Sequence, residues 1–150
     1  FVVDRLGFDE CLDHRAPDFV DQLKAATPDR VDVYFDNVGG AVLDAVLRRL
    51  AMKGRVVLCG AIAVYNEEHR PPGPANYLDL ITYRGRMEGF NAFDHWERHG
   101  EITAELTALI DDGRLVHHEH VVEGLEQAPE ALNMLFRGEN LGKLVVAVAP

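Results

Sequence analysis

Hydrophobic positions recur along the chain at two spacings, one typical of helices and one typical of strands. Apolar residues three and four apart predict helices, which cover residues 1–6, 18–26, 41–52, 77–83, 101–112 and 125–136. Short runs rich in β-branched and aromatic residues predict strands, which cover residues 10–13, 31–35, 55–59, 86–90, 115–122 and 144–148. Gly7 is a typical helix stop, and Pro129 moves the start of the last helix to about Ala128.

The order of these elements predicts an α/β fold. A strand, a helix and a second strand follow one another between Val31 and Cys59, which predicts a parallel pair with a right-handed crossover. Because strands alternate with helices along most of the chain, a sheet covered by helices on both faces is expected. Residues 66–76, which contain Pro71, Pro72 and Pro74, are predicted to form a loop.

Composition narrows the class of protein. The 150 residues carry 15 Lys and Arg against 25 Asp and Glu, a formal net charge of −10. This acidic balance argues against a nucleic-acid partner, because phosphate binding needs clustered basic residues. The longest apolar run, Val56–Val64, is about half of a membrane span, so no membrane partner is expected. Two distant cysteines, Cys11 and Cys59, and no visible signal peptide favour a cytoplasmic protein with reduced thiols.

Three predicted strands end in segments suited to a ligand, namely residues 37–40, 59–65 and 90–93. In an open parallel sheet, ligands bind outside the carboxyl ends of the strands. If all three strands are parallel, these segments line one edge and form a crevice. Gly39 and Gly40 allow close approach of the backbone, and the amides opening the following helix are candidates for facing an anion. Gly-Gly also serves simply to make a turn, and the same alternative holds for Gly60.

Two polar side chains in these segments are candidates for direct contacts. Asn37 is suited to bonding a ribose or an amide, although Asn in a turn commonly bonds its own backbone. Tyr65 follows the strand exit at Cys59, where a neutral phenol is a good donor to a cofactor ribose or a substrate carbonyl. The alternative for Tyr65 is a packed aromatic ring with its hydroxyl at the surface.

The other sequence patterns do not predict a phosphate-binding, metal or nucleophile site. The sequence contains no GxGxxG fingerprint, so the part of a dinucleotide site that cradles phosphate is expected outside these residues. The cluster His117, His118 and His120 is read as a solvated strand, because a closed metal site normally needs four ligands. We therefore expect no metal site. Neither a GxSxG elbow nor an HExxH motif occurs.

Four segments together resemble a known family. They are VDVYFDNVGG, GRVVLCGAIAVYN, RMEGF and GENLGKLVV. In this order they are similar to the medium-chain dehydrogenase/reductase superfamily, and more narrowly to its zinc-free, NADPH-dependent alkenal/one oxidoreductases, the group of the prostaglandin reductases (leukotriene hydroxydehydrogenases). That group reduces the C=C bond of α,β-unsaturated aldehydes and ketones by hydride transfer from NADPH. The resemblance therefore implies an NADP-dependent oxidoreductase acting on a small enone or enal.

The resemblance also implies site residues. Tyr65 would be catalytic and lie near the substrate, and Asn140 would close over the cofactor from the C-terminal turn. The cofactor contacts that the resemblance implies are Asn37, Gly39, Cys59, Gly60, Ala61, Ile62, Tyr65, Phe90, Asn91, Ala92 and Asn140. His14 stands where relatives usually carry Tyr, which affects contacts at the adenosine end. Ala63 stands where many carry Ser, which removes one possible hydrogen bond.

The same resemblance implies a partial protein. Residues 1–114 would form a partial Rossmann domain, with strands three to six of the doubly wound order and without its first strands. Residues 115–150 would return to a catalytic domain that these residues do not include. The isolated chain is therefore expected to be inactive, and a homodimer is expected through the sheet edge at Arg86–Phe90. The alternatives are a quinone oxidoreductase of the same superfamily and a non-catalytic nucleotide-binding or interaction module.

Overall fold

The structure is a computed structural model that describes residues 1–69 and 71–148. The chain divides into two compact units, residues 10–96 and residues 1–9 together with 97–150. In the described part of the chain, no helix is long and apolar enough to cross a membrane. The predicted α/β class is confirmed, since both units contain parallel strands joined by helices.

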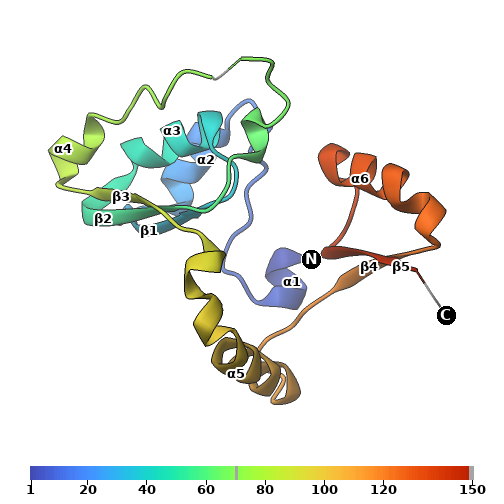
Figure 1. Ribbon diagram of the computed structural model, residues 1–150. Helices are drawn as coiled ribbons and strands as arrows, with labels where there is room; N and C mark the ends of the chain where they lie inside the picture. Colours follow the sequence, from blue (N-terminus) through green and yellow to red (C-terminus); the bar gives the residue numbers. More distant parts are fainter. Residues whose placement is uncertain (70, 149–150) are drawn as a thin grey trace. The chain divides into compact units, whose positions relative to one another are not determined.

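A three-stranded parallel sheet forms the centre of residues 10–96 (Figure 1). Its strands are β1 (Val31–Asp36), β2 (Leu50–Leu58) and β3 (Arg86–Gly89), in that spatial order. Helix α3 (Gly40–Arg48) connects β1 to β2, which confirms the predicted parallel pair with a helical crossover. The parallel alignment continues to β3, so all three strands end at the same edge.

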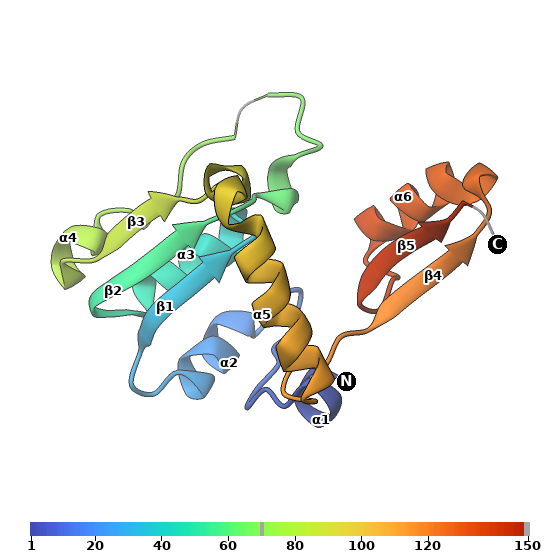
Figure 2. The same cartoon turned by 60° about the horizontal axis from the view of Figure 1, so that its bottom comes forward.

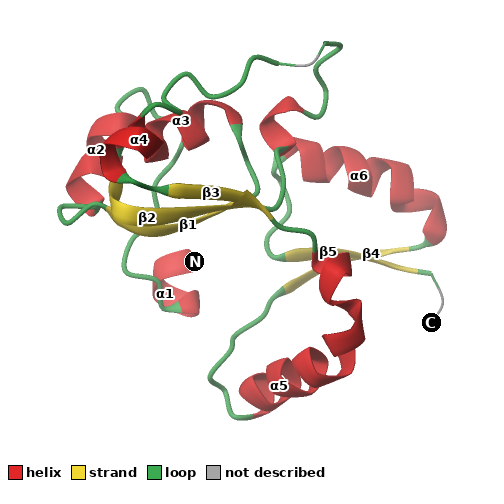
Figure 3. Cartoon of the chain, turned by 60° about the vertical axis from the view of Figure 1, so that its left-hand side comes forward, coloured by secondary structure: helices red, strands yellow, loops and turns green. Residues whose placement is uncertain are grey.

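The core of this unit lies between the sheet and three helices, α2 (Phe19–Ala26), α3 and α4 (Asp79–Tyr83), which share one face of the sheet (Figure 3). Fully buried apolar side chains come from α3 and β2, namely Leu47, Leu50 and Val56. On the strand β1, Val33 and Phe35 are exposed. The alternation of strand side chains thus directs one set of β1 residues to the core and leaves the other set accessible.

The boundary between α3 and β2 differs from the sequence prediction. The predicted helix 41–52 ends at Arg48, and the strand begins at Leu50 rather than Arg55. Leu50 is fully buried and pairs with Val31, so packing overrides the helical spacing of the apolar residues. The register then shifts, because Val33 pairs with Arg55.

Gly54 explains why this irregular stretch fits. A Cβ at Gly54 would lie 2.8 Å from the Leu50 side chain and 2.8 Å from the Val31 carbonyl oxygen. Lys53 next to it has a positive φ of 63°, a conformation common in bulges. Because Gly54 has no side chain, the extra residues of β2 can pack against β1.

One predicted strand is absent and another is shifted. Residues 10–13 form no strand, since no strand among the described residues lies beside them, and the Arg15 amide instead donates to the Asp13 carboxylate in a turn. The strand predicted at 115–122 is β4 (Glu119–Glu123), because the partner β5 (Lys143–Ala147) begins opposite Glu119. The predicted loop 66–76 is confirmed where it is described, and Arg70 lies outside the described residues.

The other unit contains a two-stranded parallel sheet of β4 and β5, shown in Figure 2. The short helix η3 (Leu125–Gln127) and α6 (Ala128–Arg137) connect the strands, with the helix start at Ala128 as predicted. Helix α1 (Val2–Leu6) ends at Gly7 with a φ of 76°, also as predicted. Helix α5 (His99–Asp111) has no buried residue, and η2 (Ala92–Arg98) precedes it.

Candidate functional site

The three strand exits meet at one edge of the sheet, as the sequence predicted. The Asp36 carbonyl oxygen, at the end of β1, accepts hydrogen bonds from the amides of Cys59 (2.8 Å) and Gly60 (3.0 Å). The Phe90 amide donates to the Leu58 carbonyl oxygen over 2.8 Å, which places the third exit beside the second. We call residues 37–40, 59–65 and 90–92 together the rim.

Two turns of the rim are joined along their length. The Asn37 carbonyl oxygen accepts from the Ile62 amide (3.1 Å), and the Val38 carbonyl oxygen accepts from the Ala63 amide (3.0 Å). The second turn continues as a short helix, η1 (Ile62–Val64). Because the first and second exits share four backbone hydrogen bonds, they form a connected surface rather than two independent loops.

Gly39 is required at its position for two reasons. Its φ of 69° and ψ of −156° lie in a region that essentially only glycine adopts. A Cβ there would also lie 3.2 Å from the Ala61 Cβ, closer than ordinary side-chain contacts. Gly39 therefore determines how closely the two turns approach. Asn37 beside it is exposed, and its side chain makes no hydrogen bond within the described residues.

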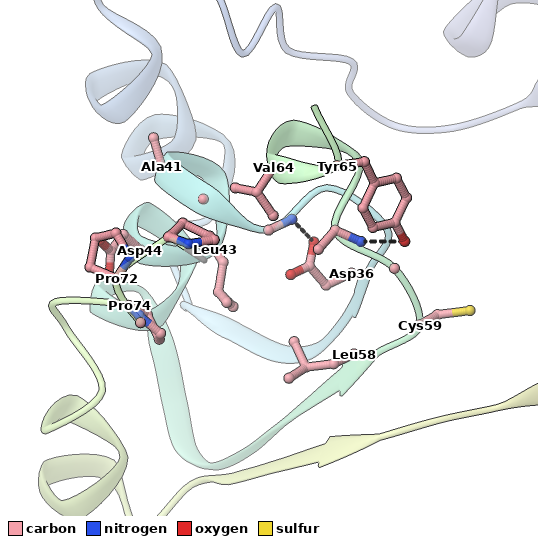
Figure 4. Close-up of a pocket in the computed structure, with 16 residues that line it drawn as sticks. Asp36, Ala41, Leu43, Asp44, Leu58, Cys59, Val64, Tyr65, Pro72 and Pro74 are labelled. Carbon is pink, nitrogen blue, oxygen red and sulfur yellow. Dashed lines mark hydrogen bonds between the residues drawn. The ribbon is translucent and has the colours of Figure 1, made fainter. Parts of the chain in front are cut away.

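Asp36 is the site residue that the sequence prediction missed. Its side chain is fully buried beneath the rim, and its Oδ1 accepts three hydrogen bonds of 2.9 Å, from the Tyr34 hydroxyl and the amides of Val38 and Gly39. Figure 4 shows the bond from the Gly39 amide. Its Oδ2 is buried and has no partner among the described residues. An Asp directly before Asn-Val-Gly-Gly is a sequence signal for such a turn, because Asp commonly bonds the amide two residues on.

The amides of Val38 and Gly39, in the turn before α3, donate to the Asp36 carboxylate and are not free to face an anion. That the amides opening α3 face an anion stays a prediction. Tyr34 stays neutral at this position, because burial, followed by its hydrogen bond to Asp36, raises the pKa of the phenol. A neutral donor and two amides thus satisfy one oxygen of a buried carboxylate.

Tyr65 lies on the rim and is 62% exposed. Its hydroxyl oxygen accepts a hydrogen bond of 3.0 Å from the Ala61 amide, visible in Figure 4. The ring folds back over Gly60, where a Cβ would lie 3.2 Å from the Tyr65 hydroxyl oxygen. Because that oxygen acts as the acceptor toward Ala61, the phenolic hydrogen remains available for donation.

A cavity of about 610 Å³ adjoins the first two turns of the rim. Its wall is formed by the start of α3, the end of β2, Tyr65 and the segment Pro71–Pro74. Asn76 anchors the end of that segment, since its amide donates to the Asp44 carboxylate and its side chain to the Asp44 carbonyl oxygen, both over 3.0 Å. Cys59 is one of the residues that line the cavity, and its exposed side chain points away from the other lining side chains in Figure 4.

The third exit is held by side-chain contacts. The Phe90 ring stacks on His95 with centroids 5.4 Å apart and meets Phe35 edge-on at 6.2 Å. The Asn91 side chain accepts from the Phe93 amide over 3.1 Å, and Ala92 begins η2. Phe90–Ala92 therefore have a defined position on the rim, as predicted.

Asn140 belongs to the other compact unit, and its role stays a prediction. Its side-chain amide donates to the Gly142 carbonyl oxygen over 2.8 Å, which shapes the turn before β5. Next to it, a hydrogen bond from Arg137 lowers the pKa of the Glu139 carboxyl. Among the described residues no group of three or more metal-ligating side chains comes together.

Comparisons with known proteins identify the family. Residues 6–146 match the family described as zinc-binding dehydrogenase, and the chain belongs to it. The resemblance to the zinc-free, NADP-dependent alkenal/one oxidoreductases of the medium-chain dehydrogenase/reductase superfamily is confirmed by the relatives that follow.

Three similar proteins show how much of the family the chain covers. It is 40% identical to the NADPH-dependent curcumin reductase of Escherichia coli, over 96% of the chain and 43% of that protein. It is 43% identical to the NADP(+)-dependent 2-alkenal reductase of Nicotiana tabacum, over 97% of the chain and 42% of that protein. The crystal structure of CurA from Vibrio vulnificus in complex with NADPH is 42% identical, with a TM-score of 0.91 over all of the chain and 46% of CurA. The chain thus spans less than half the length of these relatives.

Replacing Gly39 with alanine tests the geometry of the rim. Gly39→Ala is expected to lower the free energy of unfolding by about 1–3 kcal/mol, because the backbone conformation at Gly39 is strained for any residue with a Cβ. Urea unfolding followed by circular dichroism measures the change. Gly73→Ala is the matched control, because a Cβ there meets nothing within 4 Å, and a change within about 0.5 kcal/mol is expected. Equal effects of the two variants would contradict the rim geometry.

Proposed function

We propose that the chain supplies part of the nucleotide-binding domain and the C-terminal segment of an NADPH-dependent reductase that acts on the C=C bond of α,β-unsaturated aldehydes or ketones. The observation that carries the proposal is the rim, where three strand exits meet at one edge of a parallel sheet. The similarity to curcumin reductase and 2-alkenal reductase supports the same substrate class. In this proposal residues 1–114 belong to the nucleotide-binding domain and residues 115–150 pack toward a catalytic domain.

The residues of the rim fit the nicotinamide end of the cofactor, which carries no phosphate. The side chain of Asn37 is exposed, Gly39 and Gly60 bring the backbone of two turns close together, and Phe90 supplies an aromatic surface. We assign cofactor contacts to Asn37, Gly39, Cys59, Gly60, Ala61, Ile62, Tyr65, Phe90, Asn91, Ala92 and Asn140. When bound, NADPH supplies the hydride.

Tyr65 is the proposed catalytic residue. Its hydroxyl oxygen accepts from the Ala61 amide, and this bond polarises the phenol toward donating its own hydrogen. Donation to the carbonyl oxygen of an enone stabilises the negative charge that develops there as the β-carbon receives hydride. The role of the chain is therefore to orient the cofactor along the rim and to present one neutral donor to the substrate.

The function is tested by comparing the isolated chain with the whole reductase that contains it. We expect the whole protein to oxidise NADPH in the presence of an enone and the isolated chain to show no turnover, because the chain spans less than half of its relatives. Loss of absorbance at 340 nm, a wavelength characteristic of reduced nicotinamide, follows the reaction. Turnover only with a quinone supports the quinone oxidoreductase alternative, and binding of neither NADPH nor NADH supports a non-catalytic interaction module.

Tyr65→Phe tests the proposed donor in the whole reductase. We expect kcat for enone reduction to fall by about 100-fold, the lower end of the range for a lost acid–base group. The KM for NADPH should change little, because the ring remains in place. Tyr77→Phe is the matched control, since Tyr77 is similarly exposed but lies outside the rim and the cavity. Unchanged kcat in Tyr65→Phe would remove Tyr65 from the mechanism.

We also propose a cytoplasmic homodimer that pairs through β3. In the described sheet β3 pairs with β2 on one side, and its other side has no strand beside it. Such an edge readily pairs with another chain. Sedimentation equilibrium of the whole reductase should give twice the mass of one chain, and a monomer mass at micromolar concentration would contradict the dimer.

The exposed free thiols of Cys11 and Cys59 fit a reducing compartment, which thiol labelling in intact cells tests.

A further inference from the structure

Asp36 has an unusual environment for a charged side chain. Among the residues that the structure describes, it is the only buried polar or charged one, with 0% of its surface exposed. It lies beneath the rim and borders the cavity, at the junction of β1 and the turn that precedes α3 (Figure 4). A buried carboxylate of this kind is costly unless its oxygens are hydrogen-bonded, so its presence calls for a physical explanation.

One explanation is that Asp36 positions the two joined turns. Its side chain accepts from the amides of Val38 and Gly39, which fixes the first turn. Its main-chain carbonyl oxygen accepts from the amides of Cys59 and Gly60, which fixes the second turn. Substitution by a residue without a side-chain acceptor would leave two turn amides and the Tyr34 hydroxyl unpaired. Such unpaired groups reorganise, and the turn would move with them.

The second explanation concerns charge. The Asp36 carboxylate receives all three of its hydrogen bonds on Oδ1, while Oδ2 is buried without a partner among the described residues. A partly compensated negative charge in a buried position acts strongly on its surroundings, because little water screens it. It disfavours a phosphate at this turn and favours a positively charged group.

A nicotinamide cofactor offers both kinds of group. Its phosphates are anionic, whereas its ring is neutral in NADPH and positively charged in NADP+. We propose that Asp36 is a positioning residue that fixes the first two turns of the rim, and that its charge makes this part of the rim bind the nicotinamide ring rather than a phosphate. The same charge strengthens binding of NADP+ relative to NADPH. This inference rests on the proposed function.

The charge is tested with Asp36→Asn in the whole reductase, by measuring the dissociation constants of NADPH by fluorescence titration and of NADP+ by calorimetry. Asn retains an oxygen that accepts the same three hydrogen bonds but carries no charge. We expect the ratio of the NADP+ constant to the NADPH constant to rise by about fivefold, which corresponds to about 1 kcal/mol. The control is Asp32→Asn, an exposed Asp on the same strand, which should change the ratio less than about twofold because solvent screens its charge.

The positioning role is tested in the chain itself with Asp36→Ala. We expect hydrogen exchange of the Val38 and Gly39 amides, followed by NMR, to become at least about tenfold faster, since both amides lose their acceptor. Asp36→Asn should restore slow exchange. Exchange of the Val57 amide, within β2, normalises for any change in overall stability.

The outcomes separate the inference from the proposed function. An unchanged ratio in Asp36→Asn, or equal weakening of both cofactor forms, would overturn the charge effect. Unchanged exchange in Asp36→Ala would overturn the positioning role. If the unsubstituted whole protein binds neither NADPH nor NADP+, the proposed function fails, and the cofactor part of this inference fails with it, whereas the exchange measurement still decides the positioning role.

Discussion

Hydrogen bonds to Asp36 hold together the edge of the sheet on which the candidate site is built. The side chain fixes the turn that leaves β1, and the main chain of the same residue fixes the turn that leaves β2. Hydrogen bonds to a charged acceptor typically contribute about 1.5–3 kcal/mol each. Without these hydrogen bonds, backbone amides of both turns would have no acceptor. The bonds therefore hold the two turns in one arrangement.

The topology of the sheet determines which residues lie at this edge. Parallel alignment of β1, β2 and β3 brings their carboxyl ends to the same edge of the sheet. Helix α3 begins at that edge, because the chain must return across the sheet before β2 can run parallel to β1. The irregular start of β2 at Leu50, accommodated by Gly54, adjusts the register so that Leu58 ends opposite Asp36. Packing in the core therefore determines which residues reach the rim.

Similarity to known reductases and the geometry of the rim independently support binding of a nicotinamide cofactor at the rim. The chain belongs to a dehydrogenase family and matches an NADPH-bound relative over its whole length, while covering less than half of that relative. The rim supplies neutral groups rather than basic ones, and the buried charge beneath it is negative. This chemistry suits the nicotinamide end of a cofactor better than its phosphates.

Local sequence signals determined much of the fold. A run of β-branched and aromatic residues located β1, and Pro129 located the start of α6. The strand–helix–strand order predicted parallel alignment and a shared edge for Asn37, Gly60 and Phe90. These features depend on neighbouring residues and on the fixed handedness of crossovers, which a single sequence records. The family resemblance, rather than spacing, supplied the individual contact residues.

Only the tertiary structure decided the rest. Leu50 continues the helical spacing of α3, yet it is buried in a strand because Val31 and the core lie opposite. The sequence predicts a strand over residues 10–13, but none of the described strands pairs with them. Asp36 looks like an ordinary turn residue in the sequence, but in the folded chain it is buried, and the amides of the distant residues Cys59 and Gly60 donate to its carbonyl oxygen. Burial and pairing are set by residues distant along the chain, and for that reason local sequence patterns do not contain them.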